Sequence, residues 1–306
     1  KLAKKLCRRT GLDAVFFGNS GAEANEGAIK CARKYSVTTY GPDRNKVLTL
    51  VNSFHGRTLA TLTATGQEVF HNYFGPFNEG FVYTAAGDIE GLRELVDRHT
   101  CAIMLELIQG EGGVMALDPE YVQAVRALCD EKDLVLIVDE VQTGVGRTGT
   151  FLCCEHYNLK PDIVTLAKGL GGGLPIGAVL LSEKVAGGMG PGTHGSTFGG
   201  NPVVCAGAVE VLNRMDDTFL QNVTAKGRHM REEIEKMPHV TSVAGMGMML
   251  GIELDIDVKP VVTALMENGL LVLTAKHKMR LLPPLNIAQT ELEKGLFILK
   301  NTLAAL

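Results

Sequence analysis

The sequence predicts an α/β protein in which a mostly parallel β-sheet lies between helices. The first observation is that short, uniformly apolar segments alternate with segments of helical spacing from residue 16 to about residue 181. Such strands are typical of parallel sheets, because both faces of these sheets are buried. The second observation is the composition, 45% hydrophobic and 21% charged over 306 residues, which is enough for a large core and for about two domains.

Six apolar segments are expected as strands, and helices are expected between them. The strands are residues 46–51, 80–84, 101–107, 133–140, 162–167 and 177–182. Residues 22–40 and 118–133 carry helical spacing, and Pro119 falls in the first turn of the second helix, where its missing N–H costs no hydrogen bond. The first residues read as the middle of a helix followed by a turn, so a preceding targeting segment is left open.

A second, smaller α+β domain is expected over residues 217–306, after a large domain over residues 1–216. In this second part, apolar segments again alternate with helical ones, but on a smaller scale. Helices are expected near residues 203–215, 218–237 and 258–268 and from Thr290 onward.

Charge and cysteine content exclude several classes of function. A net charge of −4 and a pI near 6.1 argue against nucleic-acid binding, and no apolar run reaches the length of a membrane span. The seven cysteines form no C-x-x-C pair and are expected as reduced thiols in the cytoplasm, with Cys153 and Cys154 buried as small apolar side chains. No metal-binding pattern is found.

Residues that follow the predicted strands are the candidates for a ligand site, because ligands of parallel sheets bind beyond the carboxyl ends of the strands. Ser20 and Glu23 form a capping-box pattern at a helix start. That pattern alone predicts only a helix cap. Gly21 and Ala22, however, leave the amide N–H groups of the first turn open to an anion such as phosphate.

Two further loops carry suitable groups. Phe54 and Arg57 follow a strand, and together they suit a planar ring with a carboxylate nearby, although a loop arginine is often only solvated. Asp139 and Glu140 end a strongly apolar strand, so we expect a cationic partner for these buried acids. The motif GVGRTG, residues 144–149, matches a dinucleotide fingerprint but starts too far from its strand, and a flexible glycine loop is the better interpretation.

Lys168 ends the next predicted strand and is followed by glycines at 169 and 171–173. A desolvated lysine among small residues readily forms an imine with an aldehyde. The alternative is a strand-end lysine that extends into solvent. With the anion-binding helix start, the aromatic ring, the acid and the pair Ser196 and Thr197, this lysine completes the set of groups that pyridoxal 5'-phosphate (PLP) requires.

The sequence resembles the class III, ornithine/acetylornithine-type aminotransferases of PLP fold type I. The resemblance runs nearly end to end. It rests on the blocks FFGNSGAEANEGAIKCARKY, SFHGRTLATLTATGQ, LIQGEGGV, DEVQTGVGRTGTF, LAKGLGGGLPIGA and HGSTFGGNP, which occur in the family's order. Family members also carry a substantial segment before KLAKKLC, which contributes to the small domain and to the substrate pocket.

The resemblance implies a role for each cofactor-binding residue. Gly21 and Ala22 would bind the phosphate, with Ser20 supporting the turn, while Phe54 and Val141 would flank the pyridine ring. Asp139 would pair with the ring nitrogen and Gln142 with the 3'-oxygen. Lys168 would bind the cofactor covalently and later move the proton. Thr197 would reach the phosphate of a neighbouring subunit in a homodimer.

The resemblance also implies substrate contacts. Arg57 would hold the α-carboxylate, Arg280 would be a second carboxylate-binding arginine paired with Glu111, and Ser196 would lie near the partner's substrate. The implied reaction transfers the δ-amino group of N-acetylornithine to 2-oxoglutarate, as in arginine biosynthesis.

Different amino donors remain open at this point: ornithine, succinylornithine, 4-aminobutyrate and N-succinyl-diaminopimelate. Different activities remain open as well, because a fold does not fix a function. They are a PLP-dependent mutase or decarboxylase, a nicotinamide dehydrogenase based on GVGRTG, and a non-catalytic fragment.

Overall fold

The computed structural model describes residues 1–306, which form two compact units. The first unit contains residues 1–107, 117–145 and 152–214. The second contains residues 108–116, 146–151 and 215–306. Two short segments from the first half of the sequence therefore belong to the C-terminal unit, whereas a single division after residue 216 was expected. Segments of six to nine residues carry too little periodicity to reveal such a change of unit.

The first unit contains a seven-stranded sheet in the order β1-β9-β8-β7-β4-β2-β3. Five neighbouring strands of this sheet are mutually parallel: β3, β2, β4, β7 and β8. Strand β9 is antiparallel to both β8 and β1. The mostly parallel sheet is thus confirmed. The strands are β1 (Ala14–Gly18), β2 (Lys46–Leu50), β3 (Phe81–Thr84), β4 (Thr100–Leu105), β7 (Val135–Asp139), β8 (Ile163–Leu166) and β9 (Gly177–Leu181).

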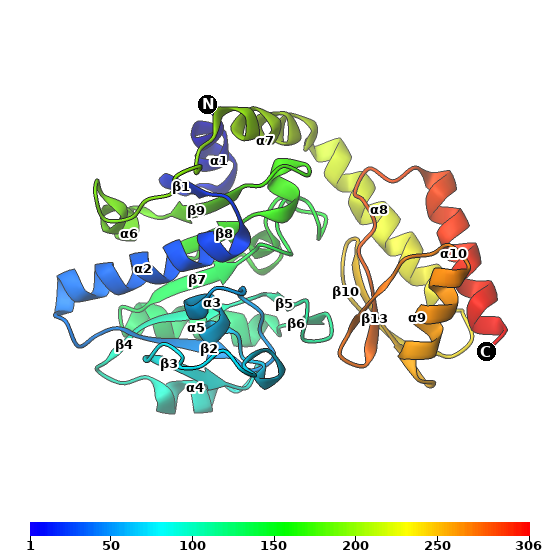
Figure 1. The fold of residues 1–306 in the computed structure, drawn as a ribbon, viewed down its shortest axis with the longest axis horizontal. Helices are drawn as coiled ribbons and strands as arrows, with labels where there is room; N and C mark the ends of the chain where they lie inside the picture. Colours follow the sequence, from blue (N-terminus) through cyan, green and yellow to red (C-terminus); the bar gives the residue numbers. More distant parts are fainter. The chain divides into compact units, whose positions relative to one another are not determined.

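Helix α2 (Gly21–Tyr40) crosses this sheet and covers one of its faces (Figure 1). Its small buried residues, Ala24, Ala28 and Ala32, allow a close approach to the strands. The opposite face is buried as well, because neighbouring strand residues such as Ile137 and Val138 are both fully inaccessible. The remaining helices of this unit are α1 (Leu2–Thr10), α3 (Leu59–Ala64), α4 (Ile89–Leu95), α5 (Pro119–Glu131), α6 (Glu183–Ala186) and α7 (Pro202–Arg214).

The strand directions bring several loops to one edge of the sheet. Strands β1, β2, β4, β7 and β8 all end at this edge, and the antiparallel β9 begins there. The residues that follow these strands therefore meet, although they come from distant parts of the sequence.

The second unit is α+β. Its antiparallel sheet has the order β10-β11-β13-β12, and β5 (Ile108–Gln109) pairs with β6 (Met115–Ala116). Helices α8 (Asp217–Ile234), α9 (Val258–Glu267) and α10 (Gln289–Ala304) share one apolar core with this sheet (Figure 1). The strands are β10 (Val240–Met246), β11 (Met249–Leu254), β12 (Leu273–Ala275) and β13 (Lys278–Leu281).

Residues 146–149 of the GVGRTG motif belong to the second unit, where Arg147 makes two hydrogen bonds to backbone carbonyl groups. Arg147 Nη1 donates to the carbonyl oxygens of Met248, at 2.9 Å, and Pro283, at 2.7 Å. Burial lowers the pKa of Arg147 to about 10. Gly149 has a φ of 97°, and a Cβ there would lie 2.3 Å from Thr224 Oγ1. These glycines serve backbone geometry and close packing, and the motif is not the loose loop that we expected.

The state of the cysteines and the polarity of the helices can be compared with the expectations from the sequence. All seven cysteines are free, and five of them, including Cys153 and Cys154, are buried as expected. Burial raises the pKa of the Cys31, Cys101 and Cys129 thiols to about 12, so these side chains stay protonated. None of the helices combines the length and the apolar character required to cross a membrane.

Two helical glycines of the second unit provide a test of its packing. A Cβ at Gly227 in α8 would lie 2.2 Å from the carbonyl oxygen of Gly247, whereas a Cβ at Gly295 in α10 meets nothing closer than 3.6 Å. We expect Gly227→Ala to destabilise the protein by about 1–3 kcal/mol through overpacking. Gly295→Ala should be neutral or stabilise the helix by about 0.5–1 kcal/mol. Urea unfolding of both variants measures the difference, and equal midpoints would contradict this packing.

Candidate active site

A cavity of about 500 Å³ opens at the edge of the sheet where the strand ends meet. It lies within the first unit and contains both Lys168 and Asp139 in its wall. Nine of the residues predicted from the sequence line it: Ser20, Gly21, Ala22, Phe54, Arg57, Asp139, Val141, Gln142 and Lys168.

The start of α2 forms one wall of this cavity. Ser20 is the N-cap, and its Oγ accepts a hydrogen bond from the backbone N–H of Glu23 at 3.1 Å. The side chain of Glu23 accepts from the N–H of Asn19 at 2.7 Å, so the expected capping pattern is present with a one-residue shift. A Cβ at Gly21 would lie 2.6 Å from Val141 Cγ1, which explains the glycine at this position. The amide groups of this first turn can therefore bind an anion.

Asp139 is 3% exposed at the end of β7, and hydrogen bonds satisfy its carboxylate. Oδ2 accepts from Asn25 Nδ2 at 2.7 Å and faces His55 Nδ1 at 2.8 Å. Oδ1 accepts from the N–H of Val141 at 3.0 Å. The amide donors are neutral, so the negative charge of the carboxylate is available to a cationic group of a ligand.

His55 is oriented by this carboxylate. Its Nδ1 faces Asp139, and its fully buried Nε2 has no hydrogen-bond partner. Since an unpaired N–H costs more than an unpaired acceptor, the arrangement favours the neutral tautomer with the proton on Nδ1. His55 therefore donates to Asp139 Oδ2 and orients the carboxylate.

Glu140, next to Asp139, does not line the cavity. Its carboxylate accepts from the backbone N–H groups of Cys153, at 2.7 Å, and Cys154, at 2.8 Å, and from Thr143 Oγ1 at 3.2 Å. Burial raises the pKa of the Glu140 carboxyl, although these hydrogen bonds oppose the shift. Backbone N–H groups and a hydroxyl therefore satisfy the Glu140 carboxylate. The expectation of a cationic partner is wrong for Glu140.

Lys168 lies two residues beyond the end of β8 and starts a short 3-10 helix (Lys168–Gly171). Its φ of 37° is unusual for a residue with a side chain and costs roughly 1 kcal/mol. Gly172 and Gly173 also have positive φ values. The lysine side chain is exposed, which corrects the expectation of a desolvated lysine. Lys168 nevertheless lines the cavity of the first unit.

Arg57 lies beside two aromatic rings. Its guanidinium is 4.3 Å from the centre of the Phe70 ring and 5.2 Å from that of Phe54. The two rings meet edge to face at 5.5 Å, and the N–H of Phe54 donates to Glu106 Oε2 at 2.9 Å. Cation–π attraction to these rings holds the Arg57 guanidinium at the cavity. The contribution of Phe70 was not predicted from the sequence.

Ser196 and Thr197 do not line the cavity. Ser196 Oγ accepts from Asn19 Nδ2 at 3.0 Å and from the N–H of Gly199 at 3.1 Å, which ties its loop to the start of α2. Thr197 is exposed.

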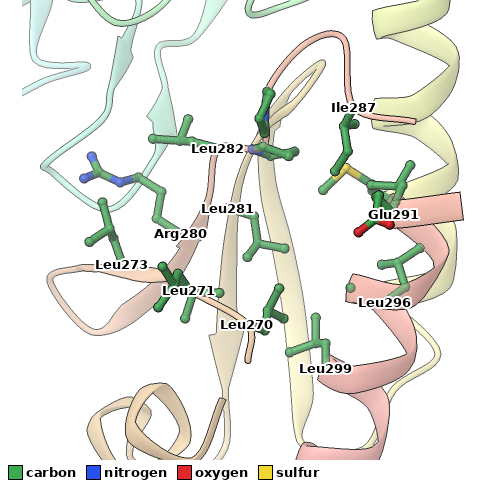
Figure 2. A pocket seen from close by; sticks show the side chains of 16 residues that line it. Leu270, Leu271, Leu273, Arg280, Leu281, Leu282, Ile287, Glu291, Leu296 and Leu299 are labelled. Atoms are coloured by element: carbon green, nitrogen blue, oxygen red, sulfur yellow. The ribbon is translucent and has the colours of Figure 1, made fainter. Parts of the chain in front are cut away.

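Glu111 and Arg280 belong to the second unit and form an ion pair there. Arg280 Nη1 lies 2.8 Å from Glu111 Oε1, and Arg280 is 5% exposed. Arg280 also borders an apolar cavity of about 260 Å³. Figure 2 shows its guanidinium directed away from Leu281, Leu296 and Leu299 of that cavity. An apolar wall offers few groups for chemistry, so the cavity of the first unit is the better candidate for the active site.

Several residues at the site were not predicted. Asn25, Glu106, Thr165 and Phe70 were not singled out in the sequence. Asn25 lies among Ala24, Ala28 and Ile29 on the buried face of α2, and a polar residue within an apolar helix face is a recognisable signal. The remaining three carry no comparable local pattern.

The family model described as "Aminotransferase class-III" matches residues 1–303, and the chain belongs to this family. The acetylornithine aminotransferase of Haemophilus ducreyi is 53% identical over 307 residues, which cover 99% of this chain and 78% of that protein.

Solved structures agree with this assignment. An ornithine aminotransferase from Toxoplasma gondii, described with partial occupancy of PLP at its active site, has a TM-score of 0.92 at 38% identity and covers 99% of this chain and 75% of its own. The N-acetylornithine aminotransferase of Stenotrophomonas maltophilia has a TM-score of 0.85 at 35% identity, covering 99% and 78%.

These findings establish the enzyme class and the fold. The chain is a PLP-dependent aminotransferase of fold type I, and its substrates are an amino donor and a keto acid. The hypothesis of a nicotinamide dehydrogenase is therefore wrong. The cavity fits PLP, because it combines an open helix start at Gly21 and Ala22 with the buried, hydrogen-bonded carboxyl group of Asp139 and the primary amine of Lys168.

Gly21→Ala tests the anion-binding helix start. The added methyl group would push Val141, whose N–H is bonded to Asp139, so we expect the affinity for PLP to fall roughly tenfold or more. Equilibrium dialysis of the apoprotein measures it. Gly187→Ala is the control, because a Cβ there meets no atom within 4 Å. An affinity of Gly21→Ala close to that of the control would contradict the proposed close packing.

Proposed function

We propose that this aminotransferase moves the δ-amino group of N-acetylornithine to 2-oxoglutarate, giving N-acetylglutamate 5-semialdehyde and glutamate, as in arginine biosynthesis. The observation that carries the proposal is the convergence of Lys168, Asp139 and the α2 start on one cavity. The choice of donor is supported by the 53% identity to the H. ducreyi acetylornithine aminotransferase.

We propose that the chain holds PLP by three groups of residues. Bound PLP supplies an aldehyde that takes up the amino group and a pyridine ring that withdraws electrons from the reacting carbon. The amides of Gly21 and Ala22 bind the phosphate, with Ser20 as the helix cap. Asp139 holds the proton on the ring nitrogen. Phe54 and Val141 fix the plane of the ring, and Gln142 contacts the 3'-oxygen; all three line the cavity.

Lys168 acts as both the covalent anchor and the base. Its primary amine would hold the cofactor aldehyde covalently. Once the amino donor has taken its place, Nζ would be the base that moves the proton of the donor's δ-carbon. Lys168 lines the cavity, so this amine lies within reach of a ligand bound there.

The carboxylates of the substrates are assigned to two arginines. Arg57, held against Phe54 and Phe70, binds the α-carboxylate and leaves the distal amino group for the cofactor. Arg280 is proposed to bind the second carboxylate of 2-oxoglutarate when it is released from Glu111. With the ion pair closed, Arg280 is neutralised while the amino donor is bound.

We also propose a homodimer in which Ser196 lies near the partner's substrate and Thr197 reaches the partner's phosphate. Tyr73 is 99% exposed and Phe198 is 69% exposed, and each lies in a segment next to a proposed site residue. Aromatic side chains are enriched in protein interfaces relative to the rest of the surface. A mass of 32.8 kDa in sedimentation equilibrium at micromolar concentration would rule out this dimer.

The proposed cellular location is the cytoplasm. The seven free thiols support a reducing compartment. The proposal fails if the native protein is found with its cysteines paired.

The visible spectrum of the purified protein with PLP tests the cofactor site and the donor together. We expect a yellow band that N-acetylornithine removes and that Lys168→Ala abolishes. We further expect kcat/KM for N-acetylornithine to exceed the values for ornithine, succinylornithine, 4-aminobutyrate and N-succinyl-diaminopimelate by roughly tenfold or more. A band that survives in Lys168→Ala would refute the role of the lysine, and a better donor would replace N-acetylornithine.

Glu111→Ala tests the gating by the ion pair. Without Glu111, Arg280 stays available to carboxylates, so the half-reaction with the amino donor should slow by roughly tenfold while that with 2-oxoglutarate is retained. Single-turnover absorbance traces separate the two half-reactions. Glu267→Ala, at an exposed position of the same unit, is the control. If neither half-reaction changes, the gating proposal is wrong.

A further inference from the structure

Asn25 is a buried polar residue at the active site that the proposed mechanism does not use. It is 1% exposed and lies in α2, four residues after Gly21. An amide side chain removed from water is costly unless its hydrogen bonds are made. Both ends of the Asn25 amide have such partners.

The amide group of Asn25 connects three separate elements. Nδ2 donates to Asp139 Oδ2 and to the carbonyl oxygen of His55, both at 2.7 Å. Oδ1 accepts from Thr165 Oγ1 at 2.7 Å. Asp139 ends β7, Thr165 lies opposite it in β8, and His55 lies in the loop after β2. Asn25 therefore fixes these elements to α2.

The orientation of this amide is determined by its partners. If the nitrogen and oxygen were exchanged, the oxygen would face the Asp139 carboxylate and the carbonyl of His55, and both contacts would be repulsive. Thr165 donates its only hydroxyl proton to Oδ1, at a shorter distance than the 3.4 Å that separates it from Asp139 Oδ1. Thr165 therefore orients Asn25, and Asn25 orients Asp139.

The position in α2 links Asn25 to the phosphate end of the site. Gly21 and Ala22 are in the first turn of the same helix, about 6 Å and about 4.5 Å along its axis from Asn25. One rigid helix thus carries the anion-binding amides and the amide that holds the carboxylate.

We propose that Asn25 is a positioning residue that fixes the Asp139 carboxylate relative to the anion-binding start of α2, so that both ends of PLP are bound at once. The inference rests on the proposed role of Asp139. It predicts that Asn25 matters for ligands that contain the pyridine nitrogen and not for ligands that lack it. A purely structural role would weaken the binding of both kinds of ligand alike.

The experiment compares PLP with its 1-deaza analogue, in which carbon replaces the ring nitrogen. The chain contains no tryptophan, so calorimetric titration of the apoprotein, prepared from the holoenzyme, measures both affinities. We expect Asn25→Ala to weaken PLP binding roughly tenfold or more and to change the binding of the analogue less than threefold. Asn25→Ala added to Asp139→Ala should cause no further loss for PLP.

Thr165→Val is the second variant, because it keeps the shape of the side chain and removes the hydroxyl, which donates to Asn25 Oδ1 at 2.7 Å and lies 3.4 Å from Asp139 Oδ1. It should show the same selective loss in smaller measure, so the inference stays testable if Asn25→Ala does not fold. Asn268→Ala, which removes an amide bonded to the Ala264 carbonyl in the second unit, should leave both affinities unchanged. Thermal unfolding of each apoprotein verifies the fold.

The possible failures are distinguishable. If Asp139→Ala weakens PLP and the analogue equally, the proposed pairing of Asp139 with the ring nitrogen is wrong, and the inference falls with it. If Asp139→Ala is selective for PLP but neither Asn25→Ala nor Thr165→Val is, only the inference about Asn25 is overturned.

Discussion

The buried carboxylate of Asp139 is the constraint on which the active site depends. A charge that is 3% exposed must receive hydrogen bonds from the protein, and its donors come from α2, from the loop after β2 and from the turn after β7. The three segments that supply these donors also line the cavity. They carry the amides at the start of α2, the Phe54 ring and the residues around Gln142. The requirement for hydrogen bonds in the core thereby determines the arrangement of the site.

Helix α2 is the element through which this constraint acts. Its alanines allow it to pack closely on the sheet, its N-terminus opens on the cavity, and Asn25 projects from its buried face to Asp139. A helix is stiff over such a short distance, so a shift at one end of the site would be transmitted to the other. Lys168 does not belong to this helix. It lies in the turn after β8, where Lys168, Gly172 and Gly173 all have positive φ values.

Local sequence patterns predicted much of this arrangement. Uniformly apolar strands indicated the parallel sheet. The rule that ligands bind beyond strand ends selected seven residues that line one cavity, and the family resemblance added Val141 and Gln142. The antiparallel β9 was not predicted, because an apolar run has the same pattern in either direction. The sequence analysis did not predict the exposure of Lys168. The glycines around it allow the backbone to approach closely, and they do so whether the lysine side chain is buried or exposed. Residues 108–116 and 146–151 belong to the second unit. This was not predicted, because segments of this length are too short to show a periodic apolar pattern.

The sequence by itself determined the class of fold and the residue types of the chemistry, since apolar periodicity and strand-end motifs are local properties. Its family resemblance paired Glu111 with Arg280, and the structure places their charged atoms 2.8 Å apart. Only the tertiary structure decided that Asn25, Thr165 and His55 surround Asp139. Asn25 and Asp139 are 114 positions apart, and the hydrogen bond between them depends on the packing of a helix against a sheet. Hydrogen-bond partners at such separations follow from three-dimensional geometry, which no local pattern encodes.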